Sequence, residues 1–128
     1  MFFDDEEKTF DIPKPLGPYS PAVRVAGMVY LSGVLPVDKT GELVAGDFEA
    51  QATQVFYNLQ QMIAMSGAEI DEIVKITFYL TDLSNFDILN KLAAQIFKEP
   101  YPARVVVGVA SLPKDAMLCA EGTLYVSQ

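Results

Sequence analysis

The 128-residue sequence contains no histidine, no tryptophan, one cysteine and two arginines. Without histidine, the chain cannot build Ser-His or Cys-His nucleophilic sites or bind a metal through imidazole. The single cysteine, Cys119, excludes an intramolecular disulfide and favours a reducing compartment. One thiol and scattered carboxylates form no recognisable metal motif, so we expect neither a metal nor a cofactor. Any chemistry therefore depends on arginine, carboxylates, tyrosine, serine or backbone groups.

Long apolar runs and basic clusters are also missing. No apolar run approaches the roughly 18–20 residues that cross a bilayer, so we expect no membrane partner. The first ten residues, MFFDDEEKTF, are acidic and lack the basic and apolar regions of an export signal, which favours the cytoplasm. The net charge of −8 and the pI of about 4.3 oppose binding to the phosphates of nucleic acids.

What remains is sufficient for a folded protein. The length predicts one domain over residues 1–128, large enough to bury a core. Hydrophobic residues make up 51% of the sequence, charged residues 20%, and the mean hydropathy is +0.23. This composition excludes disorder and is rich for a small monomer, so it favours a buried interface with another chain.

Hydrophobic periodicity predicts the element order β-β-α-β-α-β-β. The expected elements are strands at 22–26 and 28–35, a helix from 47 to 67, a strand at 73–80, a helix from 84 to just before 100, and strands at 103–110 and 117–126. Asp47 is a suitable N-cap for the first helix, whose polar face includes Gln51 and Asn58. Ser84 and Asp87 resemble a capping box at the start of the second helix.

This order indicates an α+β fold in which two helices cover one face of one sheet. The strand at 103–110 is apolar on both sides, with Val105 and Val107 on one face and Arg104 and Val106 on the other. A strand of this kind is usually covered on both faces, and two helices cover only one. We therefore expect a homo-oligomer, with Arg104 pointing away from the helices toward the interface.

Arg104 is the principal candidate for binding. It adjoins a run of three valines, where a guanidinium is costly to desolvate unless a partner pairs with it. One explanation is an ion pair with Glu121 or a bridge to another subunit. The other is a clamp that grips the carboxylate of a small, singly charged organic acid through two parallel hydrogen bonds.

Other residues have a structural and a functional interpretation each. Tyr19 lies in a segment with four prolines and either pins this segment or performs chemistry. Ser32 and Gly33 interrupt a strand, which indicates a bulge or a close backbone approach, for instance by a ligand. Asn90 lies off the apolar face of its helix and is expected in solvent. Cys119 has no cationic neighbour in sequence beyond Arg104, which favours an inert thiol over a nucleophile.

Four segments, GPYSPAV, YLSGVLP, DLSNFDILN and YPARVVVGVASLPKDAMLCAEG, resemble in order and spacing those of the RidA (YjgF/YER057c/UK114) family, essentially over the full length. The PAR and LPKD pieces are the most specific. The resemblance implies a chorismate-mutase-like α+β fold and a homotrimer with ligand sites in the clefts between subunits. It also implies hydrolysis of reactive 2-imino acids or their enamine tautomers, of the 2-iminobutanoate and 2-iminopropanoate type, to 2-keto acids and ammonia.

The resemblance also assigns roles to residues. The arginine of the PAR motif, here Arg104, binds the substrate carboxylate, and the backbone N–H two residues later, here that of Val106, assists it. Four further residues close or line the pocket in the family, here Tyr19, Ser32, Gly33 and Asn90. The family commonly has cysteine at the Val106 position, a change that keeps the backbone N–H.

One departure bears on catalysis. The glutamate that positions the attacking water in active members aligns with Cys119. Glu121 points to the same side, but two residues along a strand are roughly 6–7 Å apart, whereas proton transfer needs about 2.6–3.2 Å. The sequence therefore predicts an imine deaminase of reduced efficiency. A non-catalytic protein that binds 2-keto or related small carboxylic acids is the alternative, and an endoribonuclease or translation inhibitor is disfavoured by the low pI.

Overall fold

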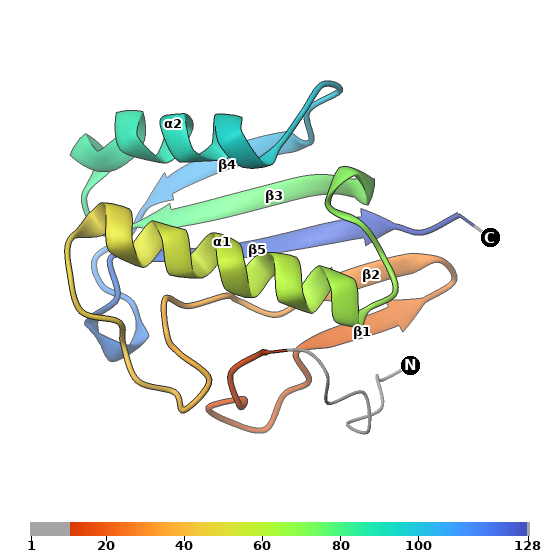
Figure 1. Cartoon of the computed structure of the whole chain (residues 1–128), viewed down its shortest axis with the longest axis horizontal. Helices are drawn as coiled ribbons and strands as arrows, with labels where there is room; N and C mark the ends of the chain where they lie inside the picture. The colour runs from red at the N-terminus through yellow and green to blue at the C-terminus, as the bar shows by residue number, and fades with distance from the viewer. Residues whose placement is uncertain (1–10, 128) are drawn as a thin grey trace.

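A computed structural model describes residues 11–127, so the acidic first ten residues lie outside the described part. The predicted element order is confirmed (Figure 1). The elements are β1 (Ala22–Val25), β2 (Met28–Leu31), α1 (Phe48–Met65), β3 (Ile73–Leu80), α2 (Phe86–Ile96), β4 (Ala103–Gly108) and β5 (Leu118–Tyr125). The strands form one five-stranded sheet in the order β1-β2-β5-β3-β4. The β3–β4 pair is parallel and the other pairs are antiparallel, so the sheet is mixed.

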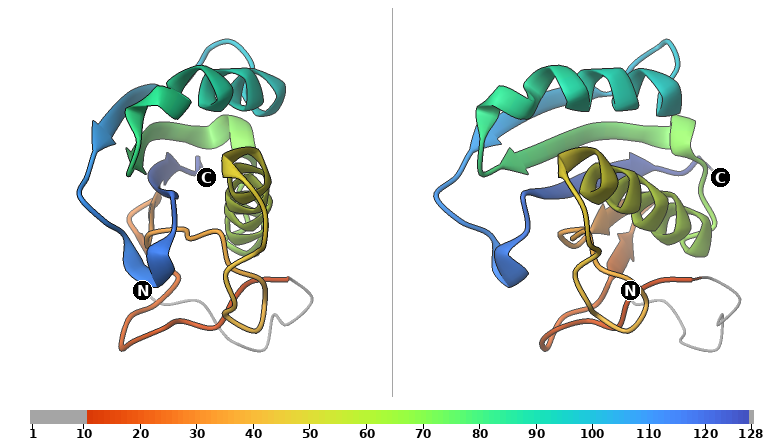
Figure 2. Two further views of the ribbon diagram at one scale, coloured as in Figure 1. Left: turned by 90° about the vertical axis from the view of Figure 1, so that its left-hand side faces the viewer. Right: turned by 60° about the vertical axis from the view of Figure 1, so that its left-hand side comes forward.

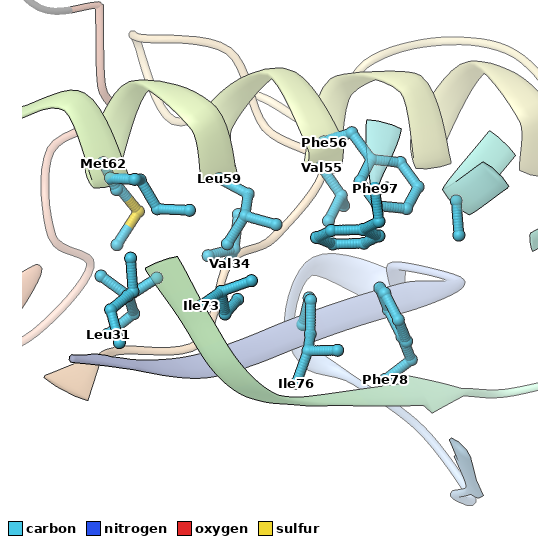
Figure 3. Close-up of a cluster of buried hydrophobic side chains, with 14 of the residues drawn as sticks. Leu31, Val34, Val55, Phe56, Leu59, Met62, Ile73, Ile76, Phe78 and Phe97 are labelled. Atoms are coloured by element: carbon cyan, nitrogen blue, oxygen red, sulfur yellow. The ribbon is translucent and has the colours of Figure 1, made fainter. Parts of the chain in front are cut away.

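Both helices pack over the same face of the sheet (Figures 1 and 2). Between them and the strands lies a cluster of buried aliphatic and aromatic side chains (Figure 3). Phe56 from α1, Phe78 from β3 and Phe97 at the end of α2 meet edge to face at its centre, with centroids 5.8 and 6.2 Å apart. The predicted α+β class, with one mixed sheet and two helices on one face, is confirmed.

The start of α1 is as predicted and the start of α2 is not. The Ala50 N–H donates to Asp47 Oδ1 at 3.1 Å, so Asp47 is the N-cap of α1. The capping box predicted from Ser84 and Asp87 does not form. Instead the Ser84 N–H donates to Asp82 Oδ1 at 2.9 Å and opens a short 3₁₀ turn, which delays α2 to Phe86.

Two polar residues of α1 that periodicity assigned to the solvent face are buried. Asn58 donates to the carbonyl oxygens of Leu35 and Val37 at 3.0 and 2.8 Å. The Gln51 Oε1 accepts from the Met117 N–H at 2.9 Å. Both side chains form hydrogen bonds with backbone groups of neighbouring segments. A buried polar side chain with its hydrogen bonds formed costs little free energy.

The faces predicted for β4 are reversed. Arg104 is in register with Ile76, and Val106 with Phe78, and both partners are fully buried on the helix side. Arg104 therefore lies on the helix side, while Val105 and Val107 face away from the helices. The physical reason is that β4 is an edge strand, so a guanidinium on its helix side still reaches solvent and is not desolvated.

The face without helices exposes large apolar side chains on strands at both sides of the sheet. Val25, Tyr30, Val105, Val107 and Tyr125 lie on this open face, with between 36% and 52% of their surface accessible. An apolar surface of this kind is typical of a protein–protein interface. The open face is apolar even though the faces of β4 are reversed, because Val105 and Val107 lie there in place of Arg104 and Val106.

Candidate functional site

Arg104 lies against the first half of α2. Its Nη1 donates to Asn90 Oδ1 at 2.7 Å, and its Cζ lies 5.5 Å from the centroid of the Phe86 ring. Phe86 and Asn90 are four residues apart, so one face of α2 presents both to β4. The expectation that Asn90 only contacts solvent is therefore wrong, because its side chain orients the guanidinium.

The guanidinium keeps free donors. Within residues 11–127, Asn90 is the one hydrogen-bond partner of its five N–H groups. The ion pair with Glu121 does not form within the chain, because Glu121 lies on the open face and accepts a hydrogen bond from the Tyr79 hydroxyl. A positive, exposed and oriented fork of donors is the arrangement that binds a carboxylate in two parallel hydrogen bonds.

A second group of the predicted residues gathers elsewhere. Tyr19, Ser32, Gly33 and Cys119, together with Leu35 and Pro113, line an open hollow of about 290 Å³. The Ser32 hydroxyl donates to the Ser20 carbonyl at 2.6 Å, which ties the proline-rich segment to the end of β2. The Tyr19 hydroxyl accepts from the Leu16 N–H at 3.1 Å, and nearly half of the tyrosine surface is accessible. Tyr19 therefore forms an ordered wall of the hollow.

The absence of a side chain at Gly33 leaves room for the thiol of Cys119. A Cβ atom added to Gly33 would lie 3.1 Å from Cys119 Sγ, which is closer than most real contacts of this kind. The close approach that a strand glycine indicated is thus made by the thiol. Burial raises the pKa of Cys119 to about 11, and the neighbouring Glu121 carboxylate adds to the rise. At neutral pH the residue is an uncharged thiol, a weak donor and a poor base.

Tyr79 is a member of this region that sequence reasoning missed. It is in register with Cys119 on the neighbouring strand and donates its hydroxyl hydrogen to Glu121. This hydrogen bond raises the pKa of Tyr79. The pairing of β3 with β5 would have revealed the neighbour, but the register of two strands distant in sequence is not encoded in either strand alone.

The two groups cannot meet around one small ligand within a single chain. Arg104 lies on the helix side of β4, whereas Cys119 lies on the open face of β5, with β3 between the two strands. Two strand spacings alone amount to about 10 Å, and the sheet separates the side chains further. The structure brings Arg104, Asn90 and Val106 together in one group and Tyr19, Ser32, Gly33 and Cys119 in another.

Among the described residues, no three or more cysteine or carboxylate side chains converge as metal ligands would. Across residues 11–127, neither helix combines the length and the apolar character that a membrane crossing requires.

Comparison with known proteins gives a consistent result. The family model described as Endoribonuclease L-PSP matches residues 9–123. A 2-iminobutanoate/2-iminopropanoate deaminase of Dermatophagoides farinae is 37% identical over 115 residues, which cover 89% of this chain and 90% of the relative. A relative named as an imine deaminase is thus similar to this chain over most of its length.

Solved structures of other proteins are similar to this chain in both fold and sequence. The crystal structure of RidA from an Antarctic Psychrobacter is 43% identical, with a TM-score of 0.87 over 91% of this chain and 94% of that one. The crystal structure of TdcF from E. coli with bound serine is 34% identical, with a TM-score of 0.88 over 99% of each chain. The fold that the resemblance implied is confirmed, and the chain belongs to the RidA family, the family of the Endoribonuclease L-PSP model.

Proposed function

We propose that the protein hydrolyses small reactive 2-imino acids, of the 2-iminobutanoate and 2-iminopropanoate type, to 2-keto acids and ammonia at reduced efficiency. The observation that carries the proposal is the Arg104 guanidinium, which Asn90 and Phe86 hold and whose remaining donors have no partner within residues 11–127. A relative named as a deaminase for these imines and a neighbour with bound serine, itself a small amino acid with a carboxylate, support the same ligand class.

The proposed reaction adds water across the C=N bond. The water oxygen bonds to the imine carbon and the nitrogen gains a proton; the resulting tetrahedral adduct then releases ammonia as the carbonyl forms. Arg104 holds the substrate carboxylate, with the backbone N–H of Val106 as second donor. Ser32 and Gly33 line the pocket and Tyr19 closes it. Binding and orientation supply most of the rate, because no charged base is available at Cys119.

We also propose that the site is completed between subunits of a homotrimer. Arg104 and the hollow that Cys119 lines lie on opposite faces of the sheet, so one ligand reaches both only if two chains contribute. The open face, with its exposed valines and tyrosines, supplies an apolar surface for assembly.

The assembly has a direct test. The chain has a mass of 14.0 kDa, so a trimer should have a solution mass of about 42 kDa by light scattering or native mass spectrometry. Val107→Asp, on the open face, should shift the mass toward that of a monomer, because three copies would then bury three carboxylates without partners. Gln95→Asp on the exposed surface of α2 adds the same single negative charge and should leave the mass unchanged. A monomeric wild-type protein would contradict both the trimer and the shared site.

The second candidate is a binding protein for 2-keto or related small carboxylic acids. It is favoured by the neutral thiol of Cys119, at the position where the resemblance implies a water-positioning glutamate. An endoribonuclease, the activity in the description of the family model, is disfavoured because the net charge is −8. Nuclease activity that persists in Arg104→Ala and after further purification would support the endoribonuclease hypothesis.

The deciding experiment generates 2-iminobutanoate in situ with a threonine dehydratase and follows its conversion to 2-ketobutanoate. We expect acceleration over buffer that is saturable and depends on protein concentration. A protein that binds 2-ketobutanoate without accelerating its release would support the binding-protein alternative and contradict the deaminase.

A further inference from the structure

A second cavity, of about 310 Å³, lies on the helix side of the sheet next to Arg104. Its lining includes Ala93 and Ala94 of α2, Phe97 at the C-terminal end of that helix, and Tyr101, which precedes β4. The guanidinium of Arg104 and the Asn90 amide that holds it also line this space. The hollow on the open face shares none of these residues.

The cavity is polar toward one end and apolar toward the other. Asn90 and Phe97 are seven residues apart on α2, so the cavity follows the helix for about 10 Å from the guanidinium. The Phe97 ring is buried and packs edge to face on Phe56, which makes the apolar end rigid. Ala94 lines the cavity and is exposed, so the space is accessible from solvent.

Charge complementarity identifies the occupant. Within the described residues, the guanidinium donates one N–H to Asn90 and pairs with no carboxylate. It therefore presents a positive group at the edge of an apolar space. We propose that this cavity binds a monocarboxylic acid with an apolar tail of about five to eight carbons, its carboxylate on Arg104 and its tail along Ala94 toward Phe97 and Tyr101.

This ligand position is distinct from the one in the proposed function. A 2-imino acid uses Arg104 together with the hollow of another subunit, whereas the tail of a longer acid lies under α2 in the same chain. Both carboxylates need the same guanidinium, so the longer acid excludes the shorter one. The inference requires only binding, so it stands or falls independently of the deaminase activity.

The test measures binding of hexanoate and acetate to the full chain, by following the ¹³C-labelled methyl groups of the alanines by NMR. Hexanoate should shift the signals of Ala93 and Ala94 and bind at least about tenfold more tightly than acetate, because its tail leaves water. Ala94→Phe fills the cavity from its exposed side and should weaken hexanoate binding about tenfold without affecting acetate. Ala64→Phe, at an exposed position of α1, is the matched control and should change neither affinity.

Two further variants keep the test decisive. Tyr101→Ala removes an exposed wall and should weaken hexanoate severalfold, and Arg104→Ala should abolish binding of both acids. Equal affinities of the wild type for hexanoate and acetate, or unchanged Ala93 and Ala94 signals on saturation with hexanoate, would overturn the proposal. Hexanoate binding without imine hydrolysis would contradict the proposed function alone, and imine hydrolysis that hexanoate does not inhibit would contradict this cavity alone.

Discussion

Replacing Arg104 with alanine should lower kcat/KM for 2-iminobutanoate by about 10²–10⁴-fold. Among residues 11–127, the guanidinium is the one group at the site that can hold the carboxylate by two charge-assisted hydrogen bonds, and each such bond contributes about 1.5–3 kcal/mol. Asn90 and Phe86 fix its position in advance, so little of that contribution is lost to ordering the side chain. Initial rates with the coupled dehydratase, and titration with 2-ketobutanoate, measure the loss.

Two controls separate binding from folding. Arg24→Ala removes the other arginine, whose Nη1 lies 3.4 Å from the Ser66 carbonyl at the end of α1, and should leave activity unchanged. Arg104→Lys keeps the positive charge but not the planar fork, so it should recover only part of the loss. The thermal unfolding midpoint of Arg104→Ala should remain near that of the wild type, because the side chain is exposed. An alanine variant with wild-type kcat/KM would exclude Arg104 from the site.

The elements were predictable because their signals are local. The 18 residues of α1 carry an N-cap and a helical apolar pattern, and the bounds of β3 follow from a run of β-branched and aromatic residues. The side of the sheet that Arg104 occupies was not predictable in this way. Alternation fixes which residues of β4 share a face, but which face meets the helices depends on β4 being the edge strand next to α2.

The burial of two polar side chains was likewise not predictable from local sequence. Asn58 and Gln51 are polar, so periodicity excludes them from the apolar face of α1. Both are nevertheless buried, because they form hydrogen bonds with backbone groups distant in sequence. The candidate site followed from family motifs, which point to Arg104 on β4 and Cys119 on β5. Their placement on opposite faces of the sheet depends on strand order and register, and it means that one chain alone cannot bring both residues to one small ligand.

Replacing Cys119 with glutamate should raise kcat by about 10²–10⁴-fold, the usual contribution of a positioned general acid–base group. The thiol is uncharged at neutral pH because burial raises its pKa to about 11, so it does not activate water. The hollow beside it, of about 290 Å³, has room for the longer side chain on the open face. Arg104 is untouched, so the affinity for 2-ketobutanoate should change little, and the gain should lie in kcat. Dehydratase-coupled rates at saturating imine measure it.

The pH profile and a neutral variant test whether the gain comes from the carboxylate. Cys119→Gln has the shape of the glutamate without its charge, so it should remain as slow as the wild type. Burial and the nearby Glu121, which raise the pKa of the thiol, act on a glutamate in the same place. The gain should therefore be full well above the raised pKa of the new carboxyl and disappear as the pH falls through it. A glutamate variant no faster than the glutamine variant at every pH would show that water is positioned by another group, of which Glu121, held by Tyr79, is the first to test by Glu121→Gln.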